Sequence, residues 1–292
     1  MLNIRTRVKA AILAFIHPKP IPLMRPVSLG CPTGSEGSLL VGRNALITGA
    51  GQNIGRNIAL EMAKQGANVY YTDVDATRVG SLGEELKKFK IQSKGFVSDV
   101  SKFEEIDSLC RSLCQENIPI DILVNNVGVL IGPYKVTSVE MDIWRKTFDT
   151  NVTGPLYLTR QIVAEMTERK LLGSVIFISS IHQWLLHRDI SYSASKAALG
   201  MVINELAIDL APYAIRVNGI APGSVAEEVD SMQRYDKYIP LYNTPINPAY
   251  IGRAAVYLAS EHYSAYTTGS VLTVDSGLSL YNHFVDRRPP GI

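Results

Sequence analysis

The chain has 292 residues, of which 46% are hydrophobic and 19% are charged. This composition is typical of a soluble globular protein, and the length suits one large α/β domain or two small ones. The formal net charge of +2 excludes the strongly basic field of a nucleic-acid-binding protein.

The first 38 residues differ from the rest of the chain. Residues 1–35 contain no Asp or Glu but five Lys or Arg, and their apolar run, 10–16, is short. A membrane span needs about 20 residues, so we expect no integral span. Three interpretations stay open: a disordered extension, which we favour, a mitochondrial-type presequence, or a helix that docks on a surface or partner. Cytoplasmic localisation is expected, with organellar or membrane-surface targeting as the alternative.

From residue 39 onward, short apolar segments alternate with helical segments of ten or more residues. The expected strands cover 44–48, 67–73, 94–100, 120–126, 173–180, 214–223 and 270–277, and the expected helices cover 54–65, 76–90, 102–116, 138–170, 190–211 and 249–259. This alternation predicts βαβ units, and nearly continuous apolar strands indicate burial on both faces. We therefore predict an α/β fold in residues 39–282, a single doubly wound, Rossmann-like parallel sheet with helices on both faces, followed by a tail, 283–292.

A glycine-bearing turn joins the first expected strand to the first helix. Gly49, Gly51 and Gly55 lie in this turn, where glycine lets the backbone approach a pyrophosphate and the helix start attracts its charge. Asp73 ends the second strand, where a carboxylate accepts hydrogen bonds from an adenosine ribose. Its charge repels the 2′-phosphate of NADP, so we predict NAD. Arg78 is the residue that would compensate, and helix capping is the alternative role of Asp73.

The cysteines favour neither a metal centre nor disulfides. Cys110 and Cys114 lie four residues apart on an expected helix, and Cys31 stands alone. A C-x3-C pair without a second Cys or His pair does not make a zinc site, and an odd count argues against a disulfide framework. We therefore expect no metal, and buried thiols in a reducing compartment.

Several motifs, in order, resemble those of the short-chain dehydrogenase/reductase family. They are TGAGQNIG (48–55), NNVG (125–128), NVTG (151–154), YSASK (192–196) and IAPG (220–223). Asn53 replaces a glycine, and asparagine tolerates left-handed geometry. The resemblance covers residues 39–282 and implies a nicotinamide-dependent oxidoreductase that forms a homotetramer or a dimer.

The resemblance also implies a set of cofactor-binding residues. They are Gly49, Gly51, Asn53, Ile54, Gly55, Asp73, Asp99, Val100, Asn125, Tyr192, Lys196, Pro222, Gly223 and Val225. Asp99 and Val100 would end the third strand beside the adenine, and Asn125 would tie the central strands together. Val225 stands near the place where the family has a threonine on the nicotinamide amide.

Tyr192 and Lys196 are i, i+4 neighbours on one helix face. Ionising a phenol at pH 7 costs roughly 4 kcal/mol, and a cation about 4 Å away offers roughly 4 kcal/mol at an effective dielectric near 20. We therefore expect Lys196 to poise Tyr192 as a general acid/base near neutrality. The resemblance assigns Asn151 to a water-linked proton relay.

A serine at the end of the segment SVIFISS completes the predicted catalytic set. The motif favours Ser180, whereas the spacing usual in the family is the one that Ser179 gives. Strand alternation places the two side chains on opposite faces, so only one of them can meet the substrate. We choose Ser180, which gives the catalytic set Asn151, Ser180, Tyr192 and Lys196.

Two segments are expected to line the substrate pocket. The first, 181–190, contains His182 and Trp184, whose alternative role is packing against a neighbouring subunit or loop. SSIH and SLYNHF resemble bacterial glucose dehydrogenases of the family, and an aromatic side chain suits a sugar or another cyclic alcohol. The second segment, 224–248, is long enough for a lid.

We therefore predict hydride transfer between NAD(H) and a small-molecule secondary alcohol or ketone, with Tyr192 as general acid/base. Two alternatives stay open: an NADPH-dependent 3-oxoacyl-thioester reductase, and a cofactor-binding regulator without turnover.

Overall fold

A computed structural model of the chain describes residues 37–132, 136–186, 188–227, 239–242 and 244–280. The expectations for residues 1–36, which include Cys31, for the tail 283–292, and for residues 228–238 and 243 of the possible lid lie outside these residues.

One parallel sheet organises the described chain. Its seven strands lie in the order β3-β2-β1-β4-β5-β6-β7, and each neighbouring pair is parallel. The strands are β1 (Asn44–Ile47), β2 (Asn68–Asp73), β3 (Ser93–Val97), β4 (Ile122–Asn125), β5 (Gly173–Ile178), β6 (Ile215–Pro222) and β7 (Val271–Val274). The predicted doubly wound sheet is confirmed. The direction in which successive strands are added to the sheet reverses between β1 and β4.

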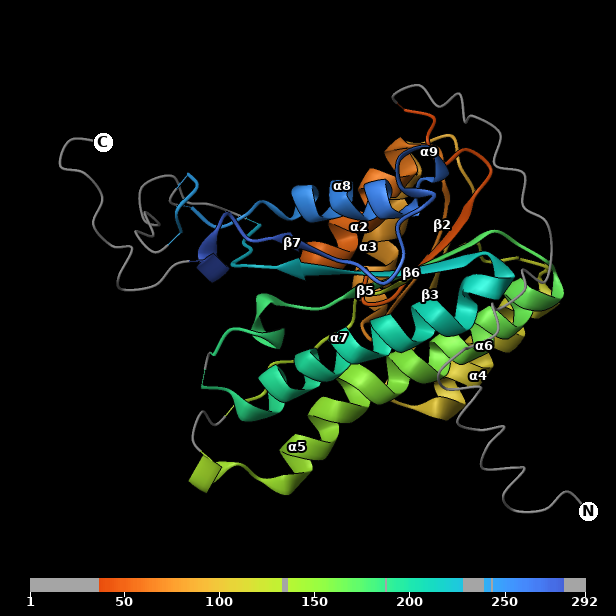
Figure 1. Cartoon of the computed structure of the whole chain (residues 1–292). Helices are drawn as coiled ribbons and strands as arrows, with labels where there is room; N and C mark the ends of the chain where they lie inside the picture. Colours follow the sequence, from red (N-terminus) through yellow and green to blue (C-terminus); the bar gives the residue numbers. More distant parts are fainter. Residues whose placement is uncertain (1–36, 133–135, 187, 228–238, 243, 281–292) are drawn as a thin grey trace, which may run out of the picture.

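Helices cover both faces of the sheet (Figure 1). One layer contains α2 (Asn53–Lys64), α3 (Ala76–Leu86) and α8 (Pro248–Ala259), and the other contains α4 (Phe103–Gln115), α5 (Met141–Phe148), α6 (Gly154–Glu168) and α7 (Ile190–Leu210). The short α9 (Glu261–Ser264) and the single turns η1 (Val136–Ser138), η2 (Asp149–Thr153), η3 (Ile181–Gln183), η4 (Ala211–Tyr213) and η5 (Leu278–Leu280) complete the described elements.

Strand β1 shows why these strands are almost entirely apolar. Ala45 and Ile47 pack into the core beneath α2 and α8, whereas Leu46 packs into the core beneath α4, α6 and α7. Because successive side chains on a strand point to opposite faces, a strand between two helical layers needs apolar residues at every position.

Several predicted elements differ from the structure in their bounds. The helix expected over 138–170 is divided into α5, the π-helical turn η2 and α6. Strand β3 ends at Val97, so Asp99 and Val100 lie in the loop beyond it, and β7 ends at Val274. Within the described residues, no helix is both long enough and apolar enough to cross a bilayer.

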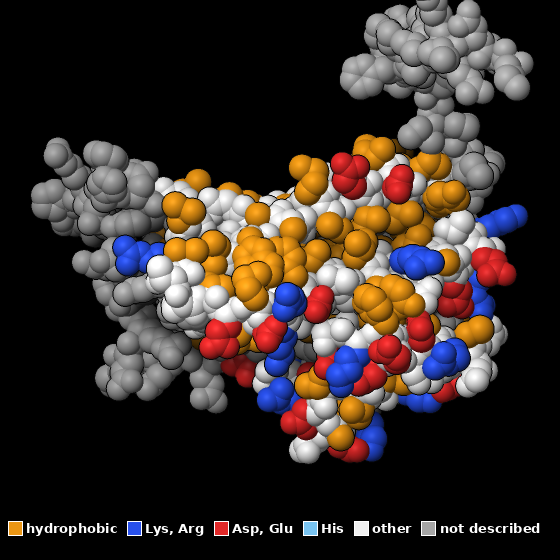
Figure 2. Space-filling view, turned by 90° about the horizontal axis from the view of Figure 1, so that it is seen from below, with side chains coloured by type: hydrophobic (Ala, Val, Ile, Leu, Met, Phe, Trp, Pro, Cys, Tyr) orange, Lys and Arg blue, Asp and Glu red, His pale blue; other side chains and the backbone are white. Residues whose placement is uncertain are grey.

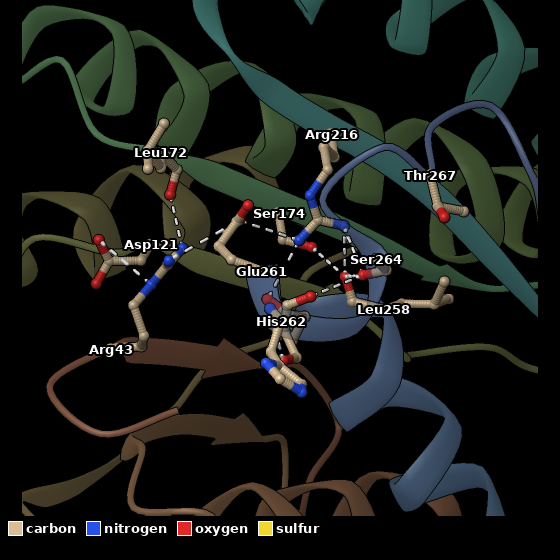
Figure 3. Close-up of polar contacts among 12 residues, drawn as sticks. Arg43, Asp121, Leu172, Ser174, Arg216, Leu258, Glu261, His262, Ser264 and Thr267 are labelled. Atoms are coloured by element: carbon tan, nitrogen blue, oxygen red, sulfur yellow. Dashed lines mark hydrogen bonds and ion pairs between the residues drawn. The ribbon is translucent and has the colours of Figure 1, made fainter. Parts of the chain in front are cut away.

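A buried polar network joins the amino-terminal ends of the strands (Figure 3). Arg216, near the start of β6, donates to Leu258 O at 2.6 Å and forms an ion pair with Glu261 at 3.2 Å. Arg43, just before β1, lies 3.9 Å from Glu261 and 4.0 Å from Asp121. These contacts fasten α8 and α9 to the sheet edge opposite the predicted ligand site.

Candidate active site

The glycine turn after β1 is held in a tight conformation. Gly49 has φ +61°, and a Cβ at Gly51 would lie 2.6 Å from the Asp73 carboxylate. Asn53 begins α2 with φ +46°, so the asparagine that replaces a glycine does adopt left-handed geometry. The turn therefore folds as its motif predicts.

Asn126 anchors this turn and was not identified from the sequence. Its side-chain nitrogen donates to Thr48 O at 2.9 Å and to Gly49 O at 3.0 Å. Asn125, the predicted residue, is buried and donates instead to Thr159 on α6 at 2.8 Å. The expectation that Asn125 joins the central strands is therefore wrong, because adjacent residues face opposite sides and only Asn126 faces the turn. The alternation of side chain directions along the strand is the sequence signal that could have identified Asn126.

A cleft of about 330 Å³ opens beside the turn, at the carboxyl ends of the strands. Its lining includes the predicted residues Gly49, Asn53, Ile54, Gly55, Asp73, Asp99 and Val100, and also Arg78, Asn126 and Gly128. Pro222, Gly223 and Val225 are not among its lining residues. Gly223 N bonds to Val274 O at 2.9 Å, and Val225 pairs with Ile246.

Two observations show that this cleft fits a dinucleotide. Gln52, the N-cap residue of α2, makes no side-chain capping bond, and the first turn of α2 has no acidic residue, so the helix start can receive a pyrophosphate. Asp73, another lining residue of the cleft, is 6% exposed, and its oxygens accept from Gly51 N at 2.9 Å and Asp75 N at 3.1 Å. Asp75, rather than Asp73, caps α3.

Arg78 lies close to this acidic residue. Its guanidinium is 3.8 Å from Asp73 and 3.7 Å from Asp75, and it is partly exposed. Both signs of charge are therefore present where the adenosine ribose would lie.

Lys196 and Tyr192 meet below the carboxyl end of β5. Lys196 is 2% exposed, its ammonium donates to Ile178 O at 2.9 Å, and its nitrogen lies 5.5 Å from the centroid of the Tyr192 ring. A Cβ at Gly128, a lining residue of the cleft, would lie 3.1 Å from this nitrogen. The Tyr192–Lys196 pair is therefore adjacent to the cofactor cleft.

Asn151 lies in the π-helical turn η2 and is fully buried. Its amide exchanges hydrogen bonds with the backbone of Val129, at 2.8 and 3.0 Å, and donates to Ser195 Oγ at 2.9 Å. It thus connects the loop after β4 to α7, one residue from Lys196.

The two candidate serines have different partners. Ser180 Oγ accepts from His182 N at 3.2 Å, and the interaction of its hydroxyl with the Tyr192 phenol lowers the pKa of that phenol. Ser179 Oγ donates to Gln183 Oε1 at 2.7 Å and lies 3.4 Å from Lys196 O. The structure therefore brings Ser180, the serine chosen from the motif, to the tyrosine.

The titration of the pair differs from expectation. Burial raises the pKa of Tyr192, the hydrogen bond from Ser180 lowers it, and the charge of Asp189 raises it again. Burial also lowers the pKa of Lys196 to about 8. The ammonium bonds to a carbonyl beneath the ring instead of the phenolic oxygen, so the expectation that Lys196 brings Tyr192 near neutrality is not met here.

The two expected substrate-pocket residues lie in different surroundings. The His182 ring meets the Tyr192 ring edge to face, with centroids 5.4 Å apart. Trp184, at the end of η3, is 48% exposed. Among the described residues, no group of three or more His, Cys, Asp or Glu side chains is arranged to hold a metal ion.

Comparisons with known proteins agree with this geometry. A family model described as enoyl-(acyl carrier protein) reductase matches residues 49–279. The chain is 32% identical to glucose 1-dehydrogenase 2 of Bacillus subtilis (strain 168) over 252 residues, which cover 83% of this chain and 96% of that protein.

Solved structures with the same fold are also similar to the chain. A 7α-hydroxysteroid dehydrogenase complexed with NADH and 7-oxo-glycochenodeoxycholic acid superposes with TM-score 0.75 at 29% identity, covering 83% of this chain and 97% of the other. A 3-oxoacyl-[acyl-carrier protein] reductase with bound NAD from Brucella melitensis gives TM-score 0.76 at 28% identity, covering 88% and 99%. The chain belongs to the short-chain dehydrogenase/reductase family and is an oxidoreductase that uses a nicotinamide cofactor to interconvert alcohols and ketones.

Proposed function

We propose that Tyr192 is the general acid/base of this enzyme and that Ser180 holds the substrate oxygen. The interaction of the Ser180 hydroxyl with the Tyr192 phenol, which lowers the pKa of the phenol, supports this assignment most directly. A substrate oxygen between the two groups would accept a hydrogen bond from Ser180 and exchange a proton with Tyr192. Lys196 would bind the cofactor, and Asn151 would hold the loop beside it.

The preferred cofactor in this proposal is NAD(H), which when bound accepts the hydride from the alcohol or supplies it to the ketone. Gly49, Gly51 and the start of α2 would hold its pyrophosphate, and Asp73 its adenosine ribose. Asp73 is nearly buried and already accepts two backbone hydrogen bonds. Its fixed negative charge disfavours a 2′-phosphate, whereas partly exposed Arg78 is screened by water.

The proposed substrate is a sugar or another cyclic secondary alcohol. His182 lies against the reactive phenol, and Trp184 offers an exposed aromatic face nearby in the sequence. The similarity to a glucose dehydrogenase and to a hydroxysteroid dehydrogenase supports a cyclic substrate. The similarity to a 3-oxoacyl reductase supports the alternative, a 3-oxoacyl thioester.

We also propose that residues 39–282 form one catalytic domain and that this domain assembles as a homotetramer. Exposed apolar side chains lie on two separate parts of its surface: Leu156, Met201 and Ile208 on α6 and α7, and Tyr250, Tyr257 and Leu272 on α8 and β7. Two self-complementary patches suit the two interfaces of a symmetric tetramer.

The test combines cofactor binding with turnover. The purified full chain is titrated with NADH and NADPH by fluorescence, then assayed with sugars, cyclic alcohols, ketones and 3-oxoacyl thioesters. Tyr192→Phe is expected to lose about 10²–10⁴-fold in turnover while NADH binding persists, because the ring stays and only the proton donor is removed. Tight binding without turnover on the whole panel would indicate a regulator, and preferential NADPH binding would overturn the role of Asp73.

A further inference from the structure

A buried carboxylate stands at the start of α7, the helix of the Tyr192–Lys196 pair. Asp189 is the N-cap of this helix and is 1% exposed. Its Oδ1 accepts from the backbone N–H of Tyr192 at 3.0 Å and from Ser191 Oγ at 3.1 Å. The cap therefore bonds directly to the backbone of the reactive residue.

Capping does not explain the charge. Asn and Ser cap helices about as well as Asp, and they carry no charge that must be taken out of water. The second oxygen of Asp189, Oδ2, is buried and has no hydrogen-bond partner among the residues that the structure describes. A buried carboxylate with one unsatisfied oxygen is costly to keep, so stability alone would favour a neutral cap here.

The other groups around Tyr192 come from several elements. The Ser180 hydroxyl lowers the pKa of the phenol, the His182 ring of η3 lies edge to face with the Tyr192 ring, and the Lys196 ammonium lies over the face of that ring. Elements that also pack on α7 carry charged residues: Asp142, Arg145 and Lys146 on α5, Asp149 in η2, and Arg216 on β6, which is paired with Glu261. Among all these charges, that of Asp189 raises the pKa of the phenol, in addition to burial.

We propose that Asp189 is a positioning residue whose cap fixes the backbone of Tyr192 and whose buried charge keeps the Tyr192 phenol protonated. The proposal rests on the proposed role of Tyr192 as general acid/base. A protonated phenol is the form that donates to a ketone, whereas alcohol oxidation needs the phenolate. Asp189 thus extends ketone reduction to higher pH and confines alcohol oxidation to alkaline conditions.

The decisive variant is Asp189→Asn, which keeps an oxygen for the cap and removes the charge. In the full chain with its nicotinamide cofactor, the pH of half-maximal alcohol oxidation is expected to fall by about one unit, because the phenol ionises more readily. Oxidation at pH 7 then rises by up to about tenfold. Asp189→Glu, which keeps the charge, is expected to retain the alkaline profile.

Asp209→Asn is the matched control. It removes one exposed acidic charge from the same helix, on the order of 30 Å from Asp189 at 1.5 Å per residue. Its pH profile is expected to equal that of the unmodified chain. If Asp189→Asn does not fold, Asp189→Ser provides another uncharged cap.

A measurement without turnover separates this proposal from the role of Tyr192. The tyrosinate absorbance of a protein, minus that of its Tyr192→Phe counterpart, gives the titration of this one phenol. A lower phenol pKa in Asp189→Asn or Asp189→Ser supports the proposal, and an unchanged phenol titration overturns it. If Tyr192→Phe keeps full turnover, the proposed function is wrong, while the absorbance titration still decides the effect of Asp189.

Discussion

At the scale of single residues, the site keeps a cation where water cannot reach it. Lys196 is 2% exposed, and its ammonium donates to Ile178 O and lies over the Tyr192 ring. Burial disfavours the charged form and lowers the pKa of Lys196 from 10.5 to about 8. The folded protein therefore bears a free-energy cost below pH 8 that it does not bear once Lys196 is neutral.

This cost predicts a pH-dependent difference between the natural chain and Lys196→Met. The folded-state pKa of Lys196 lies below its unfolded value, so between pH 8 and 10.5 the unfolded chain binds more protons and stability from this group rises with pH. From pH 7 to 9.5 the free energy of unfolding of the natural chain is expected to gain about 2 kcal/mol relative to Lys196→Met. Urea denaturation at both pH values measures this gain, and parallel curves for the two proteins would contradict it.

The residues of the site were predictable from the sequence where a motif specifies the residue type and its position. They were less predictable where the direction of a side chain decides which of two neighbouring residues faces the site. Asp73, Tyr192 and Lys196 follow from the sequence because strand ends and i, i+4 spacing place them. Asn125 was predicted where the structure uses Asn126. This error of one residue arises because the two neighbouring side chains point to opposite sides. The neighbours of Tyr192, above all Asp189, depend on how the loop after β5 folds back, which no local pattern encodes.

At the scale of elements, the π-helical turn η2 is the feature that departs most from sequence periodicity. The sequence predicts one helical stretch over 138–170, yet the helix is interrupted where Asn151 bonds to the loop after β4. At the next helix start, Gly154 lies against the backbone oxygen of Val100, so no room remains for a side chain. A tertiary contact thus overrides the regular α-helical periodicity. Single π-helical turns inside helices are frequent at functional sites.

Gly154→Ala is therefore expected to destabilise the fold by about 2 kcal/mol or more, because the added methyl group must displace backbone. Gly80→Ala in α3 is the matched control. Nothing lies within 4 Å of the position of its added Cβ, so the same substitution is expected to stabilise by up to about 1 kcal/mol through helix propensity. Denaturant unfolding of both variants measures the difference, and equal effects would refute the close contact at Gly154.

At the scale of the whole molecule, the two edges of the sheet have different chemistry. The carboxyl ends hold the glycine turn, Asp73 and the Tyr192–Lys196 pair, whereas the amino ends hold the Arg216–Glu261 network (Figure 3). The α/β order of the fold was predictable from alternating segments, because each strand between two helical layers must be apolar.

The association of copies of the molecule depends on the side chains at its surface. Figure 2 looks onto the side of α5, α6 and α7, where hydrophobic side chains gather among charged ones.

Met201 and Ile208 lie seven residues apart on α7, which places them on one face of the helix, and they are 60% and 64% exposed. If this face is one of two interfaces of a tetramer, Met201→Glu combined with Ile208→Glu is expected to give dimers, because buried like charges would oppose each other across the symmetry axis. Light scattering after size-exclusion chromatography measures the mass of both proteins.

Ser108→Glu, at an exposed position on α4, is the control that adds charge elsewhere and is expected to stay tetrameric. A natural chain that elutes with the mass of a monomer would overturn the assembly, and a double variant that stays tetrameric would remove α7 from the interface.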